Sequence, residues 1–545
     1  WLYNLRLTYP RDELYIADDD VSGAFRLMRY HPNCMGLHTS IQCGYAVVNT
    51  GGTFGDNTSP SNFDPIGVAR RQVARWLWDH EPDITKRIRP YLPPLRRRAE
   101  PGELTTSTFS QADKDDLNQG VLTSGGIRKP PPYHMHVDDG LYADVGDYLE
   151  HTICTSVGAL FSVLGPPDNP LVPSPLSTDK FEAFYNHERK LVGRHFDSRR
   201  LTVGMLPYKR AQLSDTLRDW LGRKSYQLLD IATLLGILEN HTRYARWARC
   251  WFFALQNAVR RILRERYHIV SRIFSSSARR QQYVRDLPPN LACRIEPLLS
   301  RDRAQLLWST RQKFTVTPEM KVSLEYLAHY VHDTKNPWET PLGMIIPRQP
   351  HFWSRGDASH VGGGAYCPHL CFWFDVGWSP QVLSGLKLSC ASAPGFVHIN
   401  SLEFLVVILQ LAAVRTQVAD LTPGVPSLYF PDGSPHIPVW LGETDNSVSK
   451  SWENRATASS PQGQCLVAVY AELLRTTLVH TQCKHLAGTL NVVADDISRN
   501  NFSLPLHLRT LQLFQKHPCL KSYDYFLPSP ELLQLLTSRL FSKHT

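Results

Sequence analysis

Two acidic stretches in the first 145 residues have the composition of a metal site built on strand ends. The apolar run Leu14–Ala17 leads directly into Asp18–Asp20, and Asp138 and Asp139 lie among short apolar and aromatic residues in Tyr133–Tyr142. Hard cations such as Mg²⁺ take carboxylate oxygens as ligands and keep positions open for phosphates. The two stretches together predict a metal site that handles phosphates.

The second stretch requires a turn. Successive side chains of a strand point to opposite faces, so a tight β-turn at Asp138 and Asp139 is needed to bring either carboxylate to a shared site. Gly140 follows the pair and permits such a turn. An Asp-Asp-Gly turn is also common on surface hairpins, so Asp138 and Asp139 alone do not indicate a metal site. The prediction depends on the upstream acids Asp18–Asp20.

A second set of acids lies between residues 353 and 499. Asp357 precedes a Gly-rich segment, Glu403 opens a helical stretch, Asp445 follows an apolar strand, and Asp495 lies in a short helical stretch. A two-metal nuclease needs acids from several elements, because its ions flank one phosphate from opposite sides. Each acid alone is more often a helix cap or a turn residue. The ordered set of four predicts a nuclease site.

Length and composition set the class of protein. A chain of 545 residues is too long for a single hydrophobic core. Its length predicts roughly three to five domains. The 59 Lys and Arg residues against 50 Asp and Glu give a net charge of +9, which suits a polyanionic partner without identifying one. The 11 cysteines include no C-x-x-C pair, so neither a disulfide framework nor a zinc knuckle is indicated.

No membrane span or secretion signal is expected. The longest apolar run, Phe404–Val414, is interrupted by Gln410 and is far shorter than the ~20 residues of a membrane span. The chain begins at Trp1 and shows no basic stretch followed by an apolar one. Because the sequence starts without Met, we expect a fragment or a piece cut from a longer polyprotein. The scattered cysteines are expected to be reduced thiols.

The first acids need a strand that ends at Asp18–Asp20 and a helix nearby. That helix is predicted over Pro65–Asp79, because Pro suits the first helical turn, where its missing N–H has no partner. Residues 81–132 follow without any sustained period and are rich in Pro, Ser and Thr, which predicts a flexible insertion or a partner-docking element. The arginines expected to face solvent or template are Arg70, Arg71 and Arg75.

From Tyr208 onward, apolar residues recur at helical spacing. The segment Thr242–Arg266 mixes large apolar side chains with arginines, among them Arg243 and Arg246. A basic helical face would supply sequence-independent contacts to phosphates. The alternative is an ordinary helical bundle with charged faces.

The first acidic region resembles the polymerase palm of reverse transcriptases. The segment Asp20–Phe25, of pattern D-x-x-x-A-F, resembles their first catalytic motif. Val137–Asp139 resembles their YxDD motif, with His136 where Tyr is usual. Between them, Phe54–Phe63 resembles the motif Q-G-x-x-x-S-P-x-x-F, with Gly retained and Phe in place of Gln. Farther along, Lys190–Gly204 resembles the primer-grip hairpin of these enzymes.

This resemblance implies roles for the matched residues. Asp20 and Asp138 would be the principal ligands of two Mg²⁺ ions, assisted by Asp139, and Phe25 would exclude the ribose 2′-OH. Only 19 residues precede Asp20, where the family has a fingers subdomain, so the fingers are expected to be largely missing. The residues assigned to substrate binding are Phe25, Phe54, Gly55, Arg243 and Arg246.

The second set of acids resembles the RNase H domain of retroelements. The four metal ligands implied are Asp357, Glu403, Asp445 and Asp495, and His485 matches the mobile histidine near the leaving group. Asp496 competes with Asp495 for the fourth position, but the pattern N-x-x-A-D-x-[LI]-S-R selects Asp495. The combination resembles the polyproteins of gypsy-type and DIRS-type retrotransposons.

We therefore expect a multidomain α+β protein with a polymerase palm, a helical thumb and an α/β RNase H-like domain. The palm covers 1–205, with the insertion at 81–132, and the thumb covers 206–275. A connection over 276–345 leads to the RNase H-like domain over 346–500, and a C-terminal linker covers 501–545.

The expected function is RNA-directed DNA polymerisation with RNase H activity, which copies retrotransposon RNA into DNA with Mg²⁺ or Mn²⁺, two ions per active site. The expected partners are an RNA template, a DNA primer, RNA–DNA hybrid and deoxynucleoside triphosphates, with no membrane. The expected location is intracellular, in cytoplasm, nucleus or virus-like particles. The alternatives are an inactive relic or structural nucleic-acid-binding subunit, and an RNase H nuclease with an inert palm.

Overall fold

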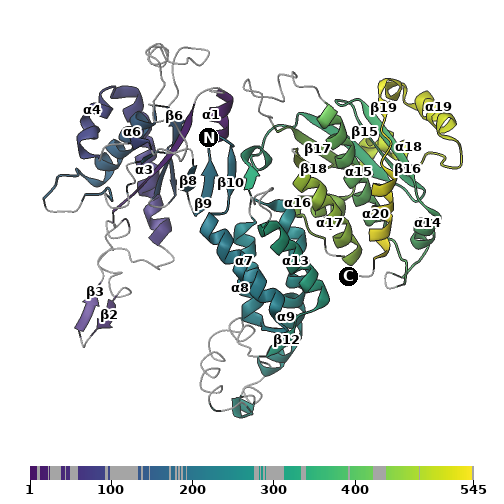
Figure 1. The fold of residues 1–545 in the computed structure, drawn as a ribbon, viewed down its shortest axis with the longest axis horizontal. Helices are drawn as coiled ribbons and strands as arrows, with labels where there is room; N and C mark the ends of the chain where they lie inside the picture. Colours follow the sequence, from purple (N-terminus) through teal and green to yellow (C-terminus); the bar gives the residue numbers. More distant parts are fainter. Residues whose placement is uncertain are drawn as a thin grey trace. The chain divides into compact units, whose positions relative to one another are not determined.

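The structure, a computed structural model, is a mixture of helices and sheets that divides into two compact units (Figure 1). The first contains Trp1–Leu206, and the second contains Pro207–Tyr429 and Gly433–Thr545. The residues that the structure describes are 1–8, 13–22, 24, 39–42, 45–48, 59–92, 96–97, 133–136, 139–146, 148–170, 174–177, 181, 184–185, 188–191, 193–242, 244–274, 281–282, 284–286, 289, 312–332, 339–390, 393–420, 437–458, 460–477 and 479–542.

Three antiparallel strands form the centre of the first unit. β1 (Leu14–Asp20) pairs with β6 (Asp139–Val145), which pairs in turn with β5 (His134–His136). Alternate side chains of a strand point to opposite faces. One face of β1 and β6 packs against the helices α3 (Ser59–His80) and α6 (Tyr148–Leu164). This arrangement brings the acidic end of β1 beside the acidic start of β6.

Shorter elements complete the described part of the first unit. β8 (Glu188–Leu191), β9 (Arg194–Asp197) and β10 (Thr202–Gly204) pair antiparallel in chain order, in the region where a hairpin was expected over Lys190–Gly204. The elements are α1 (Leu2–Thr8), β2 (Thr39–Gln42), β3 (Tyr45–Val48), α4 (Ile84–Ile88), η2 (Arg89–Tyr91), β4 (Arg96–Arg97), β7 (Phe184–Tyr185), β8 (Glu188–Leu191), β9 (Arg194–Asp197) and β10 (Thr202–Gly204).

Two expectations for the first unit are corrected. The helix predicted from Pro65 begins at Ser59, because Pro60 rather than Pro65 occupies its first turn. Arg70, expected to face solvent or template, is only 1% exposed, since it forms an ion pair with a buried carboxylate.

The predicted insertion over 81–132 also begins later than expected. Helix α4 folds onto the unit because Ile84 and Ile88, four residues apart on one helical face, are both buried in the core of the unit. Residues 98–132 lie outside the part of the chain that the structure describes.

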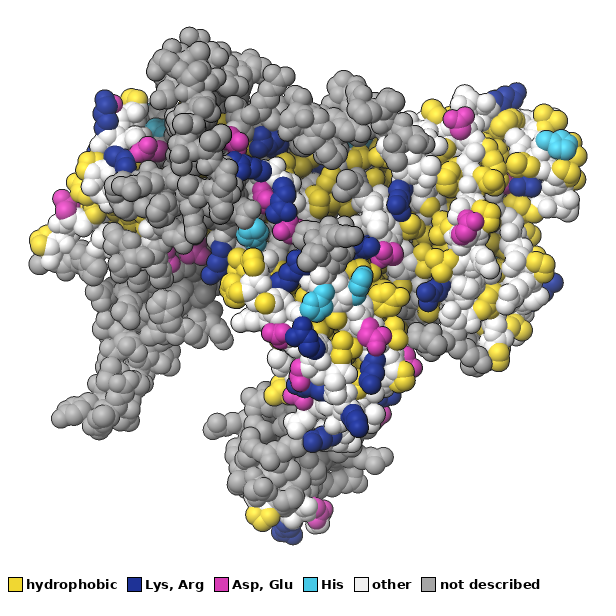
Figure 2. Space-filling model, viewed as in Figure 1, with side chains coloured by type: hydrophobic (Ala, Val, Ile, Leu, Met, Phe, Trp, Pro, Cys, Tyr) yellow, Lys and Arg dark blue, Asp and Glu magenta, His cyan; other side chains and the backbone are white. Residues whose placement is uncertain are grey.

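The second unit begins with a helical part, residues 207–332. Apolar side chains at helical spacing, including Leu213 and Leu217, are buried within it, as the sequence predicted. Its elements are α7 (Pro207–Gly222), β11 (Ser225–Gln227), α8 (Leu228–His241), η3 (Arg246–Phe252), α9 (Phe253–Phe274), β12 (Lys313–Thr315) and α13 (Pro318–His332). On the face seen in Figure 2, basic and acidic side chains are interspersed over this part.

A six-stranded sheet of order β18-β17-β14-β15-β16-β19 forms the centre of the rest of the second unit. β14 (Phe352–Ala358), β15 (Gly362–Cys367) and β16 (Phe372–Gly377) are antiparallel to one another. β17 (Val439–Thr444) runs parallel to β14, and β18 (His480–His485) runs parallel to β17. Strand order and directions of this kind bring the ends of β14, β17 and β18 to one edge of the sheet.

Helices cover both faces of this sheet. One face packs against α15 (Ile399–Asp420), α16 (Ser447–Arg455) and α17 (Pro461–Thr476) in a large hydrophobic core. The other face packs against α18 (Val492–Ser498) and α19 (Leu506–Lys516) in a smaller core. The remaining elements of this part are β13 (Glu339–Pro341), η4 (Leu342–Met344), α14 (Pro380–Leu386) and η5 (Gly488–Leu490).

Helix α15 is the central helix of the larger core. It is the one helix of the described residues that is long and apolar enough to cross a membrane, over Ile399–Val418, and 72% of that window is buried inside the protein. Its contacts with β14 and α17 account for its apolar composition.

Residues 501–545 were expected to form a linker, and the described part of this segment is folded instead. β19 (Asp524–Tyr525) adds a parallel strand beside β16, η6 (Pro518–Ser522) follows α19, and α20 (Pro530–Phe541) packs on α17. The physical cause is apolar burial: Leu520 and Leu536 are fully buried.

Candidate metal centre

Three acids meet at one edge of the large sheet. Asp357 lies near the end of β14, Asp445 follows the end of the neighbouring strand β17, and Glu403 lies in the first turns of α15. Ligand atoms of the three side chains all lie within 4.8 Å of one another. Because β14 and β17 are parallel and in register from Phe352 opposite Trp440, both strands deliver their acids to the same edge.

The electrostatics of these acids fit a hard divalent cation. Burial, followed by the charges of Asp357 and Asp445, raises the pKa of Glu403 to about 9. Its Oε2 is buried and accepts no hydrogen bond within the described part of the chain. Burial also raises the pKa of Asp357 and of Asp445. The carboxylates repel one another, and Oε2 of Glu403 accepts no hydrogen bond within the described residues. Such a group suits Mg²⁺ or Mn²⁺, which take oxygen ligands.

Helix α18 approaches this edge closely because the facing strand is rich in glycine. Gly364 of β15 lies opposite Asp357, and a Cβ built on it would be 2.1 Å from Cγ2 of Ile497 in α18. The Gly-rich segment noted in the sequence is therefore a strand, and its missing side chains make room for the helix. Ser498 of α18 is fully buried and donates a hydrogen bond of 2.5 Å to Oδ2 of Asp357.

The fourth predicted acid, Asp495, lies in α18 outside the group of three. It forms an ion pair of 2.7 Å with Arg499, and its charge contributes to the raised pKa of Asp357 after burial and Asp445. Its competitor Asp496 is held elsewhere, 2.8 Å from His517 and 3.2 Å from Lys516. Of the two, Asp495 is therefore the acid that is coupled to the site.

His485 lies at the end of β18 and is exposed. In the parallel ladder it is the partner of Thr444, the residue immediately before Asp445. Burial and Asp495 raise the pKa of Asp445, and the charge of His485 opposes them. His485 thus lies beside the acids.

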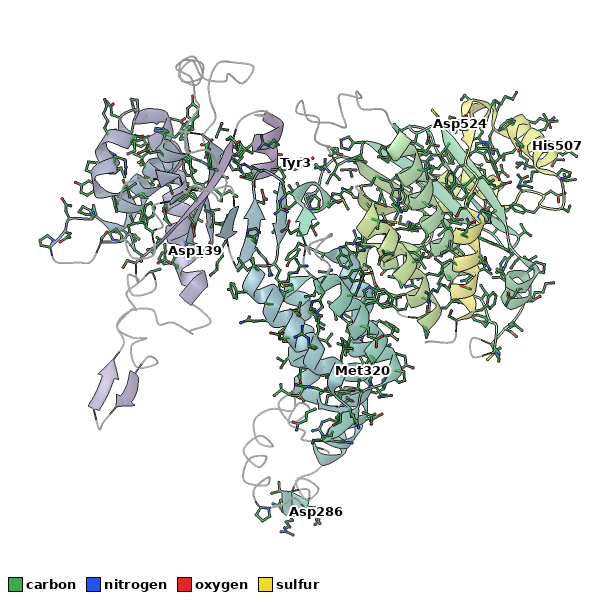
Figure 3. The ribbon with its side chains drawn as sticks, viewed as in Figure 1. Tyr3, Asp139, Asp286, Met320, His507 and Asp524 are labelled. Carbon is green, nitrogen blue, oxygen red and sulfur yellow. The ribbon has the colours of Figure 1, made fainter. Side chains whose placement is uncertain are left out.

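The acids of the first unit lie on neighbouring strands. Asp20 of β1 is the direct partner of Asp139 of β6 in the antiparallel ladder, which puts the two side chains on one face with Cβ atoms roughly 4.5–5.5 Å apart. Figure 3 marks Asp139 at the start of β6. Asp138, the third predicted ligand, lies outside the described residues.

Gly140, expected to permit a turn, is a strand residue of β6. It lies opposite Asp19 in the ladder of β1 and β6, and the residue before it, Asp139, pairs with His136 of β5. A Cβ on Gly140 would be 2.5 Å from Oδ1 of Asp19 and 2.6 Å from the hydroxyl of Tyr142. Gly140 is therefore required for space and not for a turn.

The predicted substrate-binding residues are described only in part. Arg246 of η3 donates a hydrogen bond to the backbone oxygen of Glu453 in α16. This contact, together with the buried Glu453 carboxylate nearby, directs Arg246 into the protein, in contrast to the predicted nucleic-acid contact. The other four, Phe25, Phe54, Gly55 and Arg243, lie outside the described residues.

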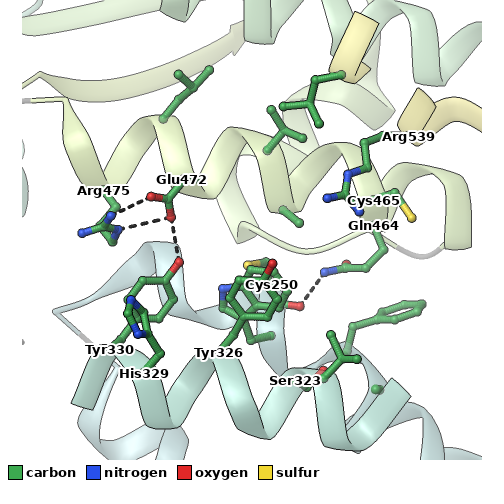
Figure 4. A pocket seen from close by; sticks show the side chains of 18 of the residues that line it. Cys250, Ser323, Tyr326, His329, Tyr330, Gln464, Cys465, Glu472, Arg475 and Arg539 are labelled. Atoms are coloured by element: carbon green, nitrogen blue, oxygen red, sulfur yellow. Dashed lines mark hydrogen bonds and ion pairs between the residues drawn. The ribbon is translucent and has the colours of Figure 1, made fainter. Parts of the chain in front are cut away.

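A separate pocket of about 770 Å³ lies among η3, α9, α13, α15, α17 and α20 of the second unit (Figure 4). Trp251 stacks on Tyr326 at one wall, with ring centroids 3.9 Å apart. At another wall, Tyr330 donates a hydrogen bond of 2.7 Å to Glu472, which also binds Arg475. None of the predicted site residues that the structure describes lines this pocket.

No protein-family model and no curated protein matches the chain. Among solved structures, the chain is similar to the foamy viral protease-reverse transcriptase in complex with RNA/DNA hybrid, with 11% identity and a TM-score of 0.31 over 86% of this chain and 44% of that chain. The dRH form in complex with ds DNA gives 10% identity and a TM-score of 0.31, over 87% and 57% of the two chains. The chain therefore spans about half the length of these two structures, 44% and 57%.

Proposed function

We propose that the second unit contains a nuclease of the RNase H kind, which cuts the RNA strand of an RNA–DNA hybrid. The main support is the convergence of Asp357, Glu403 and Asp445, whose ligand atoms lie within 4.8 Å of one another. Three carboxylates at that spacing, from two strand ends and a helix, suit ions that flank one phosphodiester. The local motifs around these acids resemble those of retroelement RNase H domains.

The residues have distinct roles in this proposal. Asp357, Glu403 and Asp445 hold the ions, with Asp495 beside them. Bound Mg²⁺ or Mn²⁺ supplies activation of the attacking water and offsets charge on the phosphate. Glu403, whose pKa is raised to about 9, gives up its proton when it becomes a ligand. His485 holds a proton for the leaving group.

We further infer that the first unit is a polymerase palm, so that the whole chain copies retrotransposon RNA into DNA. The support is the direct pairing of Asp20 with Asp139 at the edge of β1 and β6. With Asp138 as the third acid, these residues would hold two Mg²⁺ ions, which would activate the primer 3′-OH and offset charge on the triphosphate. Phe25 excludes ribonucleotides in this proposal.

Two rival functions keep the same fold without the same chemistry. A structural nucleic-acid-binding subunit or an inactive relic would cleave and extend nothing, and a nuclease with an inert palm would only cleave. The raised pKa of Glu403 argues against a purely structural acid cluster, because buried carboxylates that repel one another do not stabilise a fold.

Two assays on the full chain separate these functions. One follows cleavage of a labelled RNA strand in a hybrid, and the other follows extension of a DNA primer on an RNA template, both with Mg²⁺. Asp445→Asn should lower cleavage by more than about 100-fold, since it removes a metal ligand, while extension continues. Asp20→Asn should do the reverse.

The control is Asp219→Asn, at a side chain that is 59% exposed and pairs with Arg223. It should leave both activities unchanged. If Asp445→Asn cleaves at the parental rate, the nuclease assignment is wrong. If the parent cleaves but never extends a primer, the inert-palm alternative replaces the polymerase.

A further inference from the structure

A buried group of charged and hydroxyl side chains lies behind the acids of the first unit. Arg70 Nη1 donates to Asp19 Oδ1 at 3.0 Å, and Arg70 Nη2 donates to Asp19 Oδ2 at 2.5 Å. The hydroxyl of Tyr142 also donates to Asp19 Oδ2 and accepts from Arg70 Nη2 at 2.7 Å. The side chains of Arg70 and Asp19 are 1% and 0% exposed. We refer to Asp19, Arg70 and Tyr142 as the Asp19 cluster.

The cluster joins four elements of the first unit. Asp19 belongs to β1, Tyr142 to β6 and Arg70 to α3. On α6, the backbone oxygen of Ser156 accepts from Arg70 Nε at 3.1 Å, and Ser156 Oγ lies at hydrogen-bond distance, 3.1 Å, from the Tyr142 hydroxyl. A change in the position of Asp19 along β1 would therefore break its contacts with two other elements, α3 through Arg70 and β6 through Tyr142.

Stability alone does not explain such a cluster. Removing two charges from water costs several kcal/mol per ion, and well-packed apolar residues of similar volume are often equally stable. A buried ion pair is better attested as a device that specifies register or partner choice. In the first unit, the register of β1 against β6 is what needs to be specified.

The run Asp18–Asp20 is ambiguous by itself. Three consecutive carboxylates offer no apolar and polar alternation that would define which one faces inward, and a slip of one residue exchanges the two faces of a strand. The structure resolves the ambiguity opposite Gly140, which alone leaves space for a carboxylate beside Tyr142, as the 2.5 Å and 2.6 Å approaches to its Cβ position show. The Arg70 fork then holds both oxygens of Asp19.

The consequence appears one residue further along the strand. With Asp19 opposite Gly140, Asp20 lies opposite Asp139 on the other face of the pair. We propose that the Asp19 cluster is a register lock that positions Asp20 and Asp139 for catalysis. This inference rests on the proposed polymerase function of the first unit. The three residues of the cluster act through the two outer acids and are positioning residues.

Register can be measured without any activity. Asp18 and Leu141 are cross-strand partners on the outer face, so Asp18→Cys with Leu141→Cys should form a disulfide on mild oxidation of the full chain. Adding Arg70→Lys, which keeps the charge but removes the two-pronged contact, should lower the disulfide yield. The matched control is Arg75→Lys, at an exposed arginine of the same helix, which should leave the yield unchanged.

Activity gives the second readout, in chains without the cysteine pair. Arg70→Lys should slow primer extension by up to about 100-fold, because displacement by about 1 Å can cost that much. Hybrid cleavage by the second unit of the same chain should not change. Parental disulfide yield together with parental extension in Arg70→Lys would overturn the lock.

Two further outcomes separate the register lock from the polymerase function and from a failure to fold. If the parent extends no primer but the disulfide yield still depends on Arg70, the polymerase function fails and the register lock stands. If Arg70→Lys does not fold, Tyr142→Phe is used instead, since it removes one hydroxyl at nearly constant volume. The disulfide yield of the Tyr142→Phe variant should also be lower than that of the parent, and a yield equal to that of the parent would refute the lock.

Discussion

Ser498 in the last turn of α18 donates a hydrogen bond of 2.5 Å to Oδ2 of Asp357 in β14. Both side chains are buried. One oxygen of Asp357 is therefore engaged within the protein, and the carboxylate keeps a single orientation toward Glu403 and Asp445. Loss of a group that orients a ligating carboxylate in this way typically lowers metal affinity by about 10- to 100-fold.

Ser498→Ala should weaken Mg²⁺ binding by roughly tenfold, because Asp357 loses the donor that fixes its orientation. The measurements are the Mg²⁺ concentration for half-maximal hybrid cleavage and calorimetric Mn²⁺ binding. Ser503→Ala, at an exposed serine whose hydroxyl donates to Asn501, is the control. Unchanged Mn²⁺ affinity in Ser498→Ala would contradict the role assigned to this hydrogen bond.

Glu403→Gln should stabilise the ion-free chain at neutral and alkaline pH. The folded-state pKa of Glu403 is raised from its ordinary 4.5 to about 9, so folding favours the protonated form. The stability associated with that proton is fully present below pH 4.5 and is lost as pH rises through about 9. Gln cannot ionise, so the difference in melting temperature between variant and parent should grow with pH.

Melting curves in chelator at pH 5, 7 and 9 measure this difference. Added Mg²⁺ should reverse the order at pH 7, since only the parent has the carboxylate ligand. Glu531→Gln, at an exposed acid of α20, should follow the parent throughout. A Glu403→Gln variant that is less stable than the parent in chelator at pH 9 would show that the buried carboxylate is satisfied in some other way.

His485→Ala should slow hybrid cleavage less than Asp445→Asn does. His485 is exposed at the end of β18. In the proposed function it acts on the proton of the leaving group, whereas Asp445 would hold an ion. Single-turnover cleavage rates compare the two variants, and His507→Ala, at an exposed histidine of α19, is the control. Equal losses in the first two variants would make His485 as essential as a ligand.

Leu536→Ala should destabilise the second unit by about 2–5 kcal/mol, because it leaves a cavity where α20 packs in the larger core. Leu535→Ala on the next residue is the matched control, since Leu535 is 40% exposed. Urea unfolding measures both. If the two variants unfold at the same urea concentration, α20 is not an integral part of the folded unit.

Phe25→Ala should admit ribonucleotides into the extended primer, if this side chain occupies the space of the ribose 2′-OH. Extension with ribonucleoside and deoxyribonucleoside triphosphates compares the variant with the parent. Phe63→Ala tests specificity, because Phe63 is fully buried in the core and its loss should lower stability without changing sugar selection. Parental sugar selection in Phe25→Ala would remove the assignment.

The sequence by itself identified three acids that the structure brings together, Asp357, Glu403 and Asp445. It could do so because each acid follows or opens an element with a clear local pattern, and local periodicity indicates where strands and helices begin and end. The helical character of residues 207–274 was predictable for the same reason.

Tertiary structure decided which acid of a run faces inward. The run Asp18–Asp20 has no alternation, and only contacts with Arg70 and Gly140, 51 and 121 residues away from Asp19, select Asp19. The prediction that Arg70 faces solvent was wrong. The helical period of the sequence shows which side chains share one face of the helix, but it does not show that a buried carboxylate lies opposite that face. The same limit applies to residues 501–545, whose short apolar segments gain their structure from a sheet edge and a helix formed much earlier in the chain. Long-range partners of this kind leave no local periodicity in the sequence, so the fold alone determines them.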